Sequence, residues 1–362
     1  MYDYLIVGAG LSGITLAERL ASIGKSVLLI DKRNHVGGNC YDYFDGPILV
    51  QKYGPHLFHT SSLEVFSYLS QFTGWNDYRH RVVAFYKGSY YPIPINRTTI
   101  NAFFGVDLAS ENAVEEFLRD KRVSTPAVNN SRDVVISKYG VDLYDAFIKH
   151  YTKKQWDLFP EELDRSVLER LPIRYNDNPY YFADPYQGMP DKGFTAMFNK
   201  MLSNPNITFM ANADYRSLNN AIPYRHLIYT GKIDEYYNYK YARLDYRCIA
   251  FVFDTYDEIS HQPYPVVNFT EANPPYTRIT EFKYFYNTIA DNTICCTEYA
   301  SWHGEPSYPV SNERNRTLLQ EYLKDAARER SVSFVGRLGA YQYLNMDQAV
   351  AAALAMFKRM NH

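Results

Sequence analysis

The sequence predicts an α/β protein that combines a parallel sheet with a mostly helical region and an antiparallel β-sheet. Residues 3–7 and 26–30 are apolar runs of strand length, and residues 12–23 between them have the spacing of a helix. This β-α-β order implies parallel strands whose two faces are covered. Helical patterns broken by loops dominate between residues 61 and 165, whereas short strand-like runs dominate between residues 205 and 300.

The central region contains one clear helix and one long loop. The segment 139–156 is predicted to be helical, because Leu143, Phe147 and Tyr151 are spaced four residues apart and share one face. Residues 157–195 are rich in proline and have few periodic positions, which predicts a long functional loop.

Toward the C-terminus, strands and helices follow in order. We expect strands at Cys248–Phe253, Pro265–Phe269, Thr293–Glu298 and Ser333–Val335, and helices at Asn312–Arg330 and Gln348–Arg359. Side chains that accept a hydrogen bond favour helix starts, so Ser12 is a candidate N-cap of the first helix, and Asn345 or Asp347 of the last.

Charge and composition exclude several classes of protein. The chain has 362 residues and a formal net charge of -2, from 38 basic and 40 acidic side chains, so it lacks the basic stripe typical of nucleic-acid binding. An anionic ligand would therefore be held by a local cluster of cations rather than by the global field. No apolar run reaches the roughly 20 residues of a membrane helix. No secretory signal precedes the first strand.

Cysteine and tyrosine are informative in different ways. The four cysteines have no CxxC spacing, and we expect reduced, mostly buried thiols in a cytoplasmic protein. The 35 tyrosines have two explanations. They either serve ordinary packing or line a site for a base, a sugar and a diphosphate, since a ring with a hydroxyl tip suits both. The count alone does not choose between them.

A glycine motif lies between the first strand and the first helix. In Gly8-Ala9-Gly10-Leu11-Ser12-Gly13, the first glycine permits a tight turn, the second lets a pyrophosphate approach the backbone, and the third lets helix and strand pack closely. The helix N-terminus then presents free N–H groups to the phosphates. Asp31 ends the second strand, where a carboxylate can accept hydrogen bonds from an adenosine ribose. The segment therefore predicts a dinucleotide site.

Two further glycine segments favour FAD over a nicotinamide dinucleotide. Gly37-Gly38-Asn39 follows the acidic residue, as in FAD-binding flavoproteins. Residues 334–339 are a strand followed by a glycine turn, in which Arg337 is placed to pair with a pyrophosphate. The helix that begins after Asn345 offers N–H groups to a flavin carbonyl. An ordinary capped helix is the alternative for that segment.

Distinctive segments follow one another along the whole chain. They are residues 53–60 (YGPHLFHT), 151–156 (YTKKQW), 169–174 (ERLPIR), 180–182 (YYF), 186–190 (YQGMP), 229–234 (YTGKID), 267–270 (VNFT), 275–278 (PYTR), 308–310 (YPV) and 336–338 (GRL). In this order they resemble the prokaryotic UDP-galactopyranose mutases, and their combined specificity is far above that of the glycine motif.

The resemblance implies a fold of three parts. A Rossmann-like FAD-binding domain is expected from residues 1–60, 201–245 and 315–362. A mostly helical domain is expected over 61–75 and 97–172, with a lid loop at 159–183, and an antiparallel sheet domain over 76–96, 173–200 and 246–314.

The same resemblance implies an activity. The family interconverts UDP-galactopyranose and UDP-galactofuranose and needs reduced FAD although no net redox change occurs. Flavin N5 would attack the anomeric carbon, UDP would leave, and the N5–sugar adduct would allow the ring to open and reclose. The flavin carries this chemistry, whereas the protein orients the reactants and screens charge. The product would supply galactofuranose for cell-surface polysaccharide.

Site residues are assigned by the resemblance, position by position. The cofactor site would hold Gly8, Gly10, Leu11, Gly13, Asp31, Gly38, Asn39, His56, Leu57, Arg337, Asn345 and Met346. The substrate site would hold His80, Phe147, Tyr151, Thr152, Trp156, Arg170, Tyr181, Asn268, Arg278, Tyr308 and Tyr343.

Catalysis is assigned to Arg170, Arg278 and His59. Two guanidinium groups suit a diphosphate leaving group, and Arg170 lies in the proline-rich loop, which predicts a lid that closes over UDP. His59 would lie near flavin N5 and help proton movement. His56 and His59 lack a third ligand nearby in the sequence, so no metal site is expected. Phe147 and Tyr151 would lie near the uracil, although aromatic pairs at this spacing usually pack a core.

Three positions depart from the family pattern, and several alternatives stay open. Asn345 stands where relatives have Asp, Asp31 where Glu is commoner, and His80 near a position that often carries Asn. His80 leaves the sugar open between UDP-galactose and UDP-N-acetylgalactosamine.

A flavin-dependent oxidoreductase and a non-catalytic FAD- or UDP-sugar-binding module are the other candidates. The expected partners are a reductant, such as NAD(P)H or a reductase, and a second copy of the chain in a homodimer.

Overall fold

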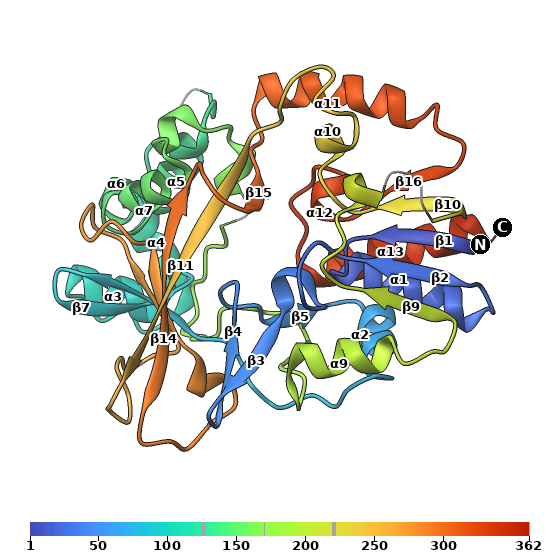
Figure 1. Ribbon diagram of the computed structural model, residues 1–362. Helices are drawn as coiled ribbons and strands as arrows, with labels where there is room; N and C mark the ends of the chain where they lie inside the picture. The colour runs from blue at the N-terminus through green and yellow to red at the C-terminus, as the bar shows by residue number, and fades with distance from the viewer. Residues whose placement is uncertain (125–126, 170, 219–221, 362) are drawn as a thin grey trace. The chain divides into compact units, whose positions relative to one another are not determined.

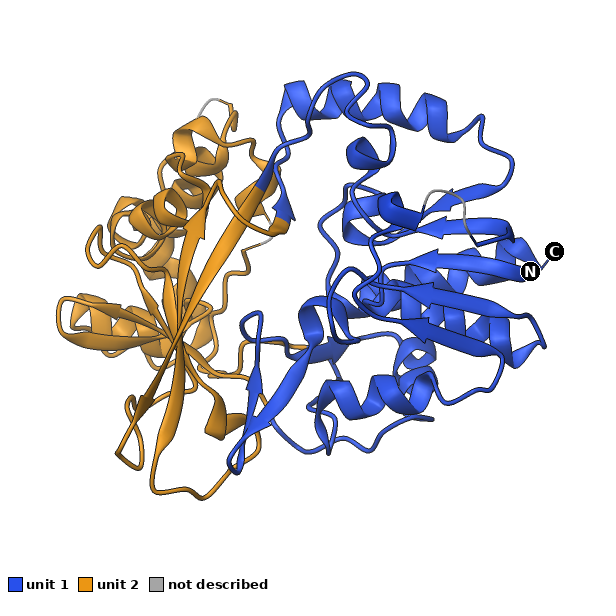
Figure 2. Ribbon diagram, viewed as in Figure 1, with its two compact units in different colours: residues 1–78, 184–246, 308–362 blue, residues 79–183, 247–307 orange. Residues whose placement is uncertain are grey.

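The computed structural model describes residues 1–124, 127–169, 171–218 and 222–361. The described residues form two compact units, coloured separately in Figure 2. Unit 1 comprises Met1–Tyr78, Asp184–Tyr246 and Tyr308–His362, and unit 2 comprises Arg79–Ala183 and Arg247–Ser307. The helices and the antiparallel sheet that were expected as separate domains thus fall mainly into one unit, and the three-part division stays a prediction.

Unit 1 is built on a parallel sheet. Its strands are β1 (Tyr2–Val7), β2 (Val27–Ile30), β9 (Ile207–Met210), β10 (Tyr224–Tyr229) and β16 (Val332–Phe334), in the order β16-β10-β1-β2-β9. Each neighbouring pair is parallel, and Figure 1 shows β10, β1, β2 and β9 side by side. All four residues of β2 are buried, as expected for a strand covered on both faces. The predicted Rossmann-like α/β class is confirmed.

Helices of unit 1 pack against this sheet. α1 (Leu11–Ser22) follows the first strand and contacts both α13 (Met346–Met360) and α9 (Gly193–Met201). The prediction that Ser12 caps α1 was wrong: the N-cap is Gly10, and the Ser12 hydroxyl donates to the Ala349 carbonyl oxygen in α13 at 3.2 Å. The glycine turn leaves no side chain at the cap, so Ser12 joins two helices instead.

Shorter elements complete unit 1. They are η1 (Gly38–Cys40), β3 (Asp42–Asp45), β4 (Ile48–Gln51), β5 (Phe58–Thr60), α2 (Leu63–Leu69), β8 (Tyr186–Gly188), η4 (Tyr215–Leu218), α10 (Ile233–Tyr236), α11 (Glu313–Ala326) and α12 (Gly336–Gly339). β5 and β8 form an antiparallel pair that brings residues far apart in the sequence together.

Unit 2 contains a large, mostly antiparallel sheet. Its strands are β6 (Val82–Tyr86), β7 (Ser89–Ile93), β11 (Tyr246–Tyr256), β12 (Val266–Phe269), β13 (Arg278–Glu281), β14 (Thr293–Ser301) and β15 (Pro306–Pro309). Their order is β15-β11-β14-β13-β12-β6-β7. The β12–β6 pair is parallel, so the expected antiparallel sheet is in fact mixed. A short helix, η5 (Phe282–Phe285), follows β13.

The helices of unit 2 precede most of these strands. They are α3 (Arg97–Phe104), α4 (Glu111–Lys121), α5 (Ser131–Tyr139), α6 (Val141–Leu143), the π-helical turn η2 (Tyr144–Ile148), α7 (Lys149–Trp156), η3 (Pro160–Glu162) and α8 (Ser166–Glu169). The side chains of Asn96, Ser110 and Asn130 cap α3, α4 and α5 by accepting backbone N–H groups, which explains where these helices begin.

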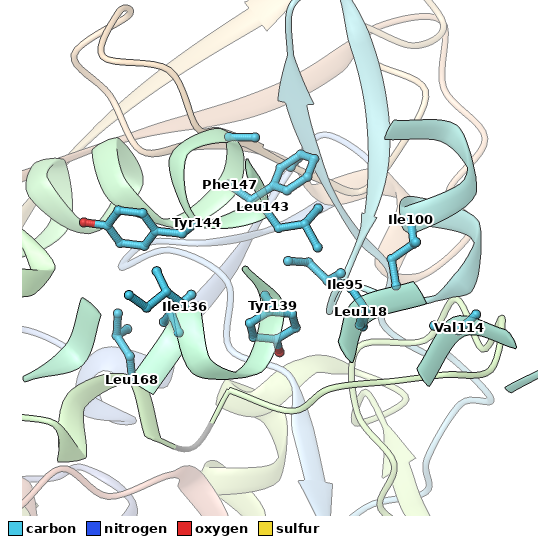
Figure 3. Close-up of a cluster of buried hydrophobic side chains, with 13 residues drawn as sticks. Ile95, Ile100, Val114, Leu118, Ile136, Tyr139, Leu143, Tyr144, Phe147 and Leu168 are labelled. Atoms are coloured by element: carbon cyan, nitrogen blue, oxygen red, sulfur yellow. The ribbon is translucent and has the colours of Figure 1, made fainter. Parts of the chain in front are cut away.

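A buried apolar cluster joins the helices of unit 2 to its β-hairpin. Leu143 and Phe147 contribute from the helical segment, and Ile95 and Ile100 from the chain after β7. Figure 3 shows this cluster, with Leu143 extending toward Ile95. Burial of each such side chain contributes about 1.5–3 kcal/mol of stability. The cluster therefore fixes residues 143–148, which lead directly into α7 and its candidate site residues.

The expected long loop at 157–195 contains regular structure. η3, α8, β8 and the start of α9 all fall within it. Proline begins η3, where it is compatible with the first turn of a helix, so the proline content did not exclude helices. Among the described residues, no helix combines the length and hydrophobicity needed to cross a bilayer.

Candidate functional site

The first glycine motif forms a turn with no room for side chains. Gly8 has φ +101°, and a Cβ atom there would lie 2.1 Å from the Thr230 hydroxyl oxygen. A Cβ atom at Gly13 would lie 1.9 Å from the Gly8 carbonyl oxygen. Both contacts are far below van der Waals distance, so glycine is required at both positions. The turn and the close packing of helix on strand are those expected of a dinucleotide-binding motif.

The second glycine segment lies against the first. Gly38 has φ +56°, and its Cβ atom would lie 2.9 Å from the Gly10 Cα. Two stretches of bare backbone therefore meet beside the N-terminus of α1. This cradle fits a pyrophosphate, because backbone N–H groups and the positive end of the helix face an anion directly.

Asp31 holds the first turn in place. One carboxylate oxygen accepts the Ala9 N–H at 2.7 Å, and the other accepts the Arg33 N–H at 2.9 Å. Arg33 also donates to the Asn39 side-chain oxygen at 3.0 Å. Asp31, predicted to hold the adenosine ribose, and Asn39, also predicted to bind the cofactor, are thus connected through Arg33, which the sequence analysis did not single out.

The C-terminal glycine turn reaches the same place. Gly336 has φ +84°, with Ser12 and Thr230 within 4 Å of its would-be Cβ atom. Arg337 donates to the Leu344 carbonyl oxygen at 3.0 Å, and its guanidinium lies 5.7 Å from the Tyr308 ring centroid and 5.8 Å from that of Tyr343. The two tyrosine rings are stacked, with centroids 5.4 Å apart.

The last helix begins within this region. Asn345 is the N-cap of α13, and its backbone N–H donates to the Gln348 side-chain oxygen at 2.9 Å, so the ordinary capped helix is present. Met346 is the first helical residue. Asp347 accepts the Thr60 hydroxyl through one oxygen, whereas its buried Oδ1 has no partner among the described residues. The N-terminus of α13 therefore keeps hydrogen-bonding capacity for a ligand.

One histidine precedes β5 and another lies within it, and the two differ in environment. The His56 N–H donates to the Gln51 side-chain oxygen at 2.7 Å, and burial lowers the pKa of its imidazole to about 4, so the ring is neutral at ordinary pH. Leu57 follows and is half-buried. His59 Nδ1 lies 2.7 Å from the Asp184 carboxylate, which fixes the ring.

Asp184 is a site residue that the sequence analysis missed. Its second oxygen accepts the Ser61 hydroxyl at 2.5 Å. Burial acts to raise the pKa of Asp184, but the hydrogen bonds from Ser61 and His59 outweigh it and lower the pKa. The carboxylate is therefore ionised at neutral pH and favours the proton on Nδ1 of His59. The pairing of β5 with β8 brings Asp184 to His59, and the local sequence around either residue does not predict this contact.

Unit 2 places three polar residues in one row across its sheet. Asn268 on β12 is in register with Arg278 on β13, and Arg278 is in register with Glu298 on β14. The Arg278 guanidinium lies 3.6 Å from a carboxylate oxygen of Glu298, which is 3% exposed. Residues in register on neighbouring strands point to the same face of a sheet. The row thus presents an amide, a guanidinium and a carboxylate together.

The row keeps unused hydrogen-bonding capacity. Asn268 Oδ1 and Glu298 Oε1 are buried and have no partner in the part of the chain that the structure describes. Burial raises the pKa of Glu298, and the Arg278 charge acts against that rise. Buried polar atoms without partners are rare in proteins, and such a group is explained by a ligand, a water or an ion.

Helix α7 supplies aromatic and hydroxyl groups. Tyr151, Thr152 and Trp156 all lie on it, and Thr152 is 3% exposed. Burial raises the pKa of Tyr151 to about 12, with the nearby Arg278 charge acting to lower it, so this hydroxyl stays protonated. Phe147, by contrast, is 2% exposed and packs on Tyr91 and Phe103, with centroids 5.2 and 5.3 Å away. These are the contacts of a core residue, which is the alternative that the spacing of Phe147 and Tyr151 left open.

Arg247 is a second residue that the sequence analysis missed. It is 2% exposed, and its guanidinium donates to the Gln155 carbonyl oxygen at 2.9 Å and lies 4.4 Å from the Trp302 ring centroid. Its Nη1 has no partner within the described residues. A buried guanidinium with a spare donor fits an anion. The only feature of the sequence that points to Arg247 is the presence of an arginine in a mostly apolar strand.

The remaining predicted residues lie in or beside the proline-rich segment. His80 is 6% exposed, and its carbonyl oxygen accepts the Tyr181 N–H at 2.7 Å. The two rings are 5.8 Å apart, and Phe182 and Phe285 lie within 6.2 Å of the His80 ring. Arg170 lies outside the described residues. No cluster of His, Cys, Asp and Glu suitable for a metal ion occurs in the described ranges.

Comparisons with known proteins find matches to two sequence models and to relatives of full length. A sequence model described as UDP-galactopyranose mutase matches residues 146–343, and one described as an NAD(P)-binding Rossmann-like domain matches residues 6–72. A probable UDP-galactopyranose mutase of Klebsiella pneumoniae is 38% identical, over 97% of this chain and 93% of that protein. A dTDP-fucopyranose mutase of Escherichia coli is 34% identical, over 98% of this chain and 97% of that protein.

Solved structures show the same fold. A crystal structure of reduced UDP-galactopyranose mutase has a TM-score of 0.76 at 17% identity and covers 100% of this chain and 96% of that chain. A putative protoporphyrinogen oxidase from Exiguobacterium has a TM-score of 0.66 at 12% identity, covering 99% and 98%. The likeness extends over the whole chain in both cases.

Proposed function

The chain belongs to the UDP-galactopyranose mutase family, and from this premise we propose that it interconverts UDP-galactopyranose and UDP-galactofuranose with reduced FAD as its cofactor. The observation that best supports this is the row of Asn268, Arg278 and Glu298, whose buried oxygens lack partners within the described residues. A nucleotide diphosphate beside a sugar offers both the anion and the hydroxyl donors that such a row requires.

The glycine cradle of unit 1 would hold the FAD. Gly8, Gly10 and Gly38 would leave room for the pyrophosphate, Asp31 would accept hydrogen bonds from the adenosine ribose with Asn39 nearby, and Arg337 would provide a cation. When bound, reduced FAD would supply a nucleophilic N5 for the anomeric carbon, which is the chemistry that the protein side chains lack. The N-terminus of α13, with Asn345 and Met346, would face the flavin carbonyls.

The diphosphate would be bound by guanidinium groups. Arg278 is held beside Glu298, with its guanidinium 3.6 Å from a carboxylate oxygen of that residue. Arg247 adds a buried donor at Nη1. Arg170 is assigned by its motif to the same ligand. Because a departing UDP gains negative charge, cations fixed in advance stabilise the transition state more than the ground state.

Aromatic and polar side chains are proposed for binding the uridine and the sugar. Tyr151, Thr152 and Trp156 on α7 are proposed for the uridine, with Tyr181 from the lid segment at 159–183. Asn268, His80, Tyr308 and Tyr343 are proposed to hydrogen-bond substrate oxygens.

His59 is proposed to move a proton during ring opening and closure. Its Nδ1 is held by Asp184, so Nε2 is the nitrogen that can exchange a proton with the substrate. The neutral His56 would contribute to the flavin environment instead. In the cell, a reductant would keep the flavin reduced, and the product would enter cell-surface polysaccharide.

A product assay tests the proposal. Protein reduced with dithionite is incubated with UDP-galactopyranose, UDP-N-acetylgalactosamine or a dTDP-fucopyranose, and the products are separated by chromatography. We expect the furanose form of UDP-galactose, with no reductant consumed in proportion to turnover. The dTDP sugar is included because a relative at 34% identity is named for it. Stoichiometric oxidation of NAD(P)H would instead identify an oxidoreductase.

A further inference from the structure

Lys154 makes a set of contacts that the proposed function does not use. Its ammonium donates to the carbonyl oxygens of Phe269, Pro274 and Tyr276, at 2.6, 3.0 and 2.8 Å. An ammonium has three N–H groups, so these three carbonyls exhaust its donors. The neighbouring Lys153 shows the ordinary alternative, since its side chain is 38% exposed and pairs with Asp157, the C-cap residue of α7.

The three carbonyls belong to the last residue of β12 and to the loop that joins β12 to β13. This loop is closed by the hydrogen bond from the Phe269 N–H to the Thr277 carbonyl oxygen, at 2.9 Å. Thr277 in turn donates its N–H to the Glu298 carbonyl oxygen on β14. The loop therefore leads directly into Arg278, and whatever holds the loop also affects where β13 begins.

Lys154 lies on the helix that carries the proposed uridine-binding side chains. Tyr151, Thr152 and Trp156 are its neighbours on α7. Its own backbone is held as well, because Arg247 donates to the carbonyl oxygens of Lys154 and Gln155 at 3.4 and 2.9 Å. Lys154 thus connects helix α7 to Arg247 and to the loop that precedes Arg278.

We infer that Lys154 is a positioning residue that holds the β12–β13 loop on α7 and so sets the distance between the diphosphate-binding Arg278 and the uridine-binding face of α7. The inference rests on the proposed function, since it assigns a role in UDP binding. A long, flexible side chain suits this role because its charge can reach three carbonyls that converge from one loop.

Because Lys154 can lose its proton, its hydrogen bonds to the loop, and with them UDP binding, are expected to depend on pH. Burial lowers the pKa of Lys154 to about 8, and the nearby Glu271 carboxylate acts to raise it. A neutral amine has two N–H groups, so above that pH one of the three carbonyls loses its donor. The charged and titratable side chains on the surrounding elements are those of Glu271 and Tyr276 in the loop, Arg247 on β11, and Glu298 and Tyr299 on β14.

The test compares Lys154→Met with the control Lys153→Met. UDP affinity is measured by titration calorimetry on the FAD-loaded protein, from pH 7 to pH 8.5. We expect Lys154→Met to weaken UDP binding at pH 7 by tenfold or more and Lys153→Met to leave it unchanged. The wild-type affinity should fall over this pH range, and Lys154→Met should remove that part of the fall. The readout is the fall in UDP affinity from pH 7 to pH 8.5 in the wild type compared with that in Lys154→Met, because the titration of UDP itself affects both proteins equally.

A double-mutant cycle separates positioning from general destabilisation. If Lys154 acts through Arg278, adding Lys154→Met to Arg278→Ala should weaken binding by much less than tenfold. Should Lys154→Met fail to fold, Lys154→Gln, which keeps two donors, carries the same comparison and should weaken binding at pH 7 to a smaller extent. Unchanged affinity in the folded Lys154 variant, or fully additive losses, would overturn the inference. Failure of the wild type to bind UDP would instead refute the proposed function.

Discussion

His59 Nδ1 lies 2.7 Å from Asp184 Oδ2, and the other oxygen of that carboxylate accepts the Ser61 hydroxyl. His59 and Asp184 are 125 residues apart in the sequence and meet because β5 pairs with β8. The pair resembles the acid–imidazole arrangement of many proton-transfer sites, in which the carboxylate fixes the tautomer and orients the ring.

Replacing Asp184 by Asn tests this arrangement. An amide removes the negative charge that holds the proton on Nδ1, and a hydrogen bond to a charged group contributes about 1.5–3 kcal/mol. We therefore predict that Asp184→Asn lowers kcat roughly tenfold to a hundredfold, measured as furanose formed by the reduced enzyme. Ser61→Ala is the control, because it removes the other hydrogen bond of the carboxylate and leaves the His59 contact. An equal loss in both variants would show that His59 orientation is not the cause.

The pKa of Asp184 also predicts a direction for stability. The native carboxyl has a pKa below its ordinary value, so its stabilising contribution is present above that ordinary value and is lost as pH falls through the native pKa. Acid unfolding should therefore be less steep in Asp184→Asn than in the wild type, as followed by circular dichroism. Identical acid transitions would contradict the assigned shift.

The cofactor cradle offers a matched pair of glycine substitutions. Gly38 and Gly46 both have φ +56°, but a Cβ atom at Gly38 would lie 2.9 Å from the Gly10 Cα, whereas nothing lies within 4 Å at Gly46. The backbone cost of alanine at positive φ is common to both variants. We predict that Gly38→Ala is purified with much less FAD and that Gly46→Ala is as yellow as the wild type. Absorbance at the flavin bands per protein gives the measure.

Wild-type protein provides the reference for that experiment. It should contain FAD that heat or acid releases unmodified. Recovery of a folded protein that binds NAD and no flavin would refute the cofactor assignment. It would also show that the Gly37-Gly38-Asn39 and Arg337 segments do not distinguish FAD from a nicotinamide dinucleotide.

The N-terminal fold could be predicted from the sequence because its signals are local. The glycine turn, the apolar strands and the helix between them occupy the first 30 residues, and each limits the backbone by itself. Ser12 was misassigned as a cap for a reason that is not local, since its partner Ala349 lies in the last helix.

The missed residues of the site depend on long-range pairing. Arg247 and Glu298 lie within strands, and only the sheet register shows that their side chains are buried beside other polar groups. Lys154 is one of two adjacent lysines, and the sequence does not show which one turns inward. The π-helical turn at Tyr144–Ile148 likewise interrupts the regular spacing of four from which Phe147 and Tyr151 were placed on one face.

The lid assignment gives a prediction for segment dynamics. Peptides that cover residues 159–183 should exchange amide hydrogens more slowly when UDP is added, because Tyr181 and Arg170 would contact the ligand. Hydrogen-exchange mass spectrometry measures this directly. Peptides from α4, which carries no proposed site residue, serve as the internal control. Equal exchange with and without UDP in both regions would contradict the lid.

Arg278 gives the sharpest test of the substrate site. Its guanidinium faces Glu298 across neighbouring strands, so it is held in place before substrate arrives, and a fixed cation acts where charge develops on the leaving UDP. Removing such a group costs about 3 kcal/mol, so Arg278→Ala should lower kcat/KM on the order of a hundredfold. The same is expected of Arg170→Ala. Lys at either position should rescue only in part, because an ammonium cannot make the planar two-bond contact with phosphate.

Two measurements make the Arg278 result specific. Flavin absorbance should be unchanged in Arg278→Ala, since the glycine cradle of FAD lies in other segments of the chain. Arg119→Ala removes a guanidinium that is 64% exposed and pairs with Glu116, and it should leave turnover intact. Near-normal turnover in both Arg278→Ala and Arg170→Ala would mean that the diphosphate is bound elsewhere. Loss of activity together with loss of FAD would mean that Arg278 supports the fold rather than the transition state.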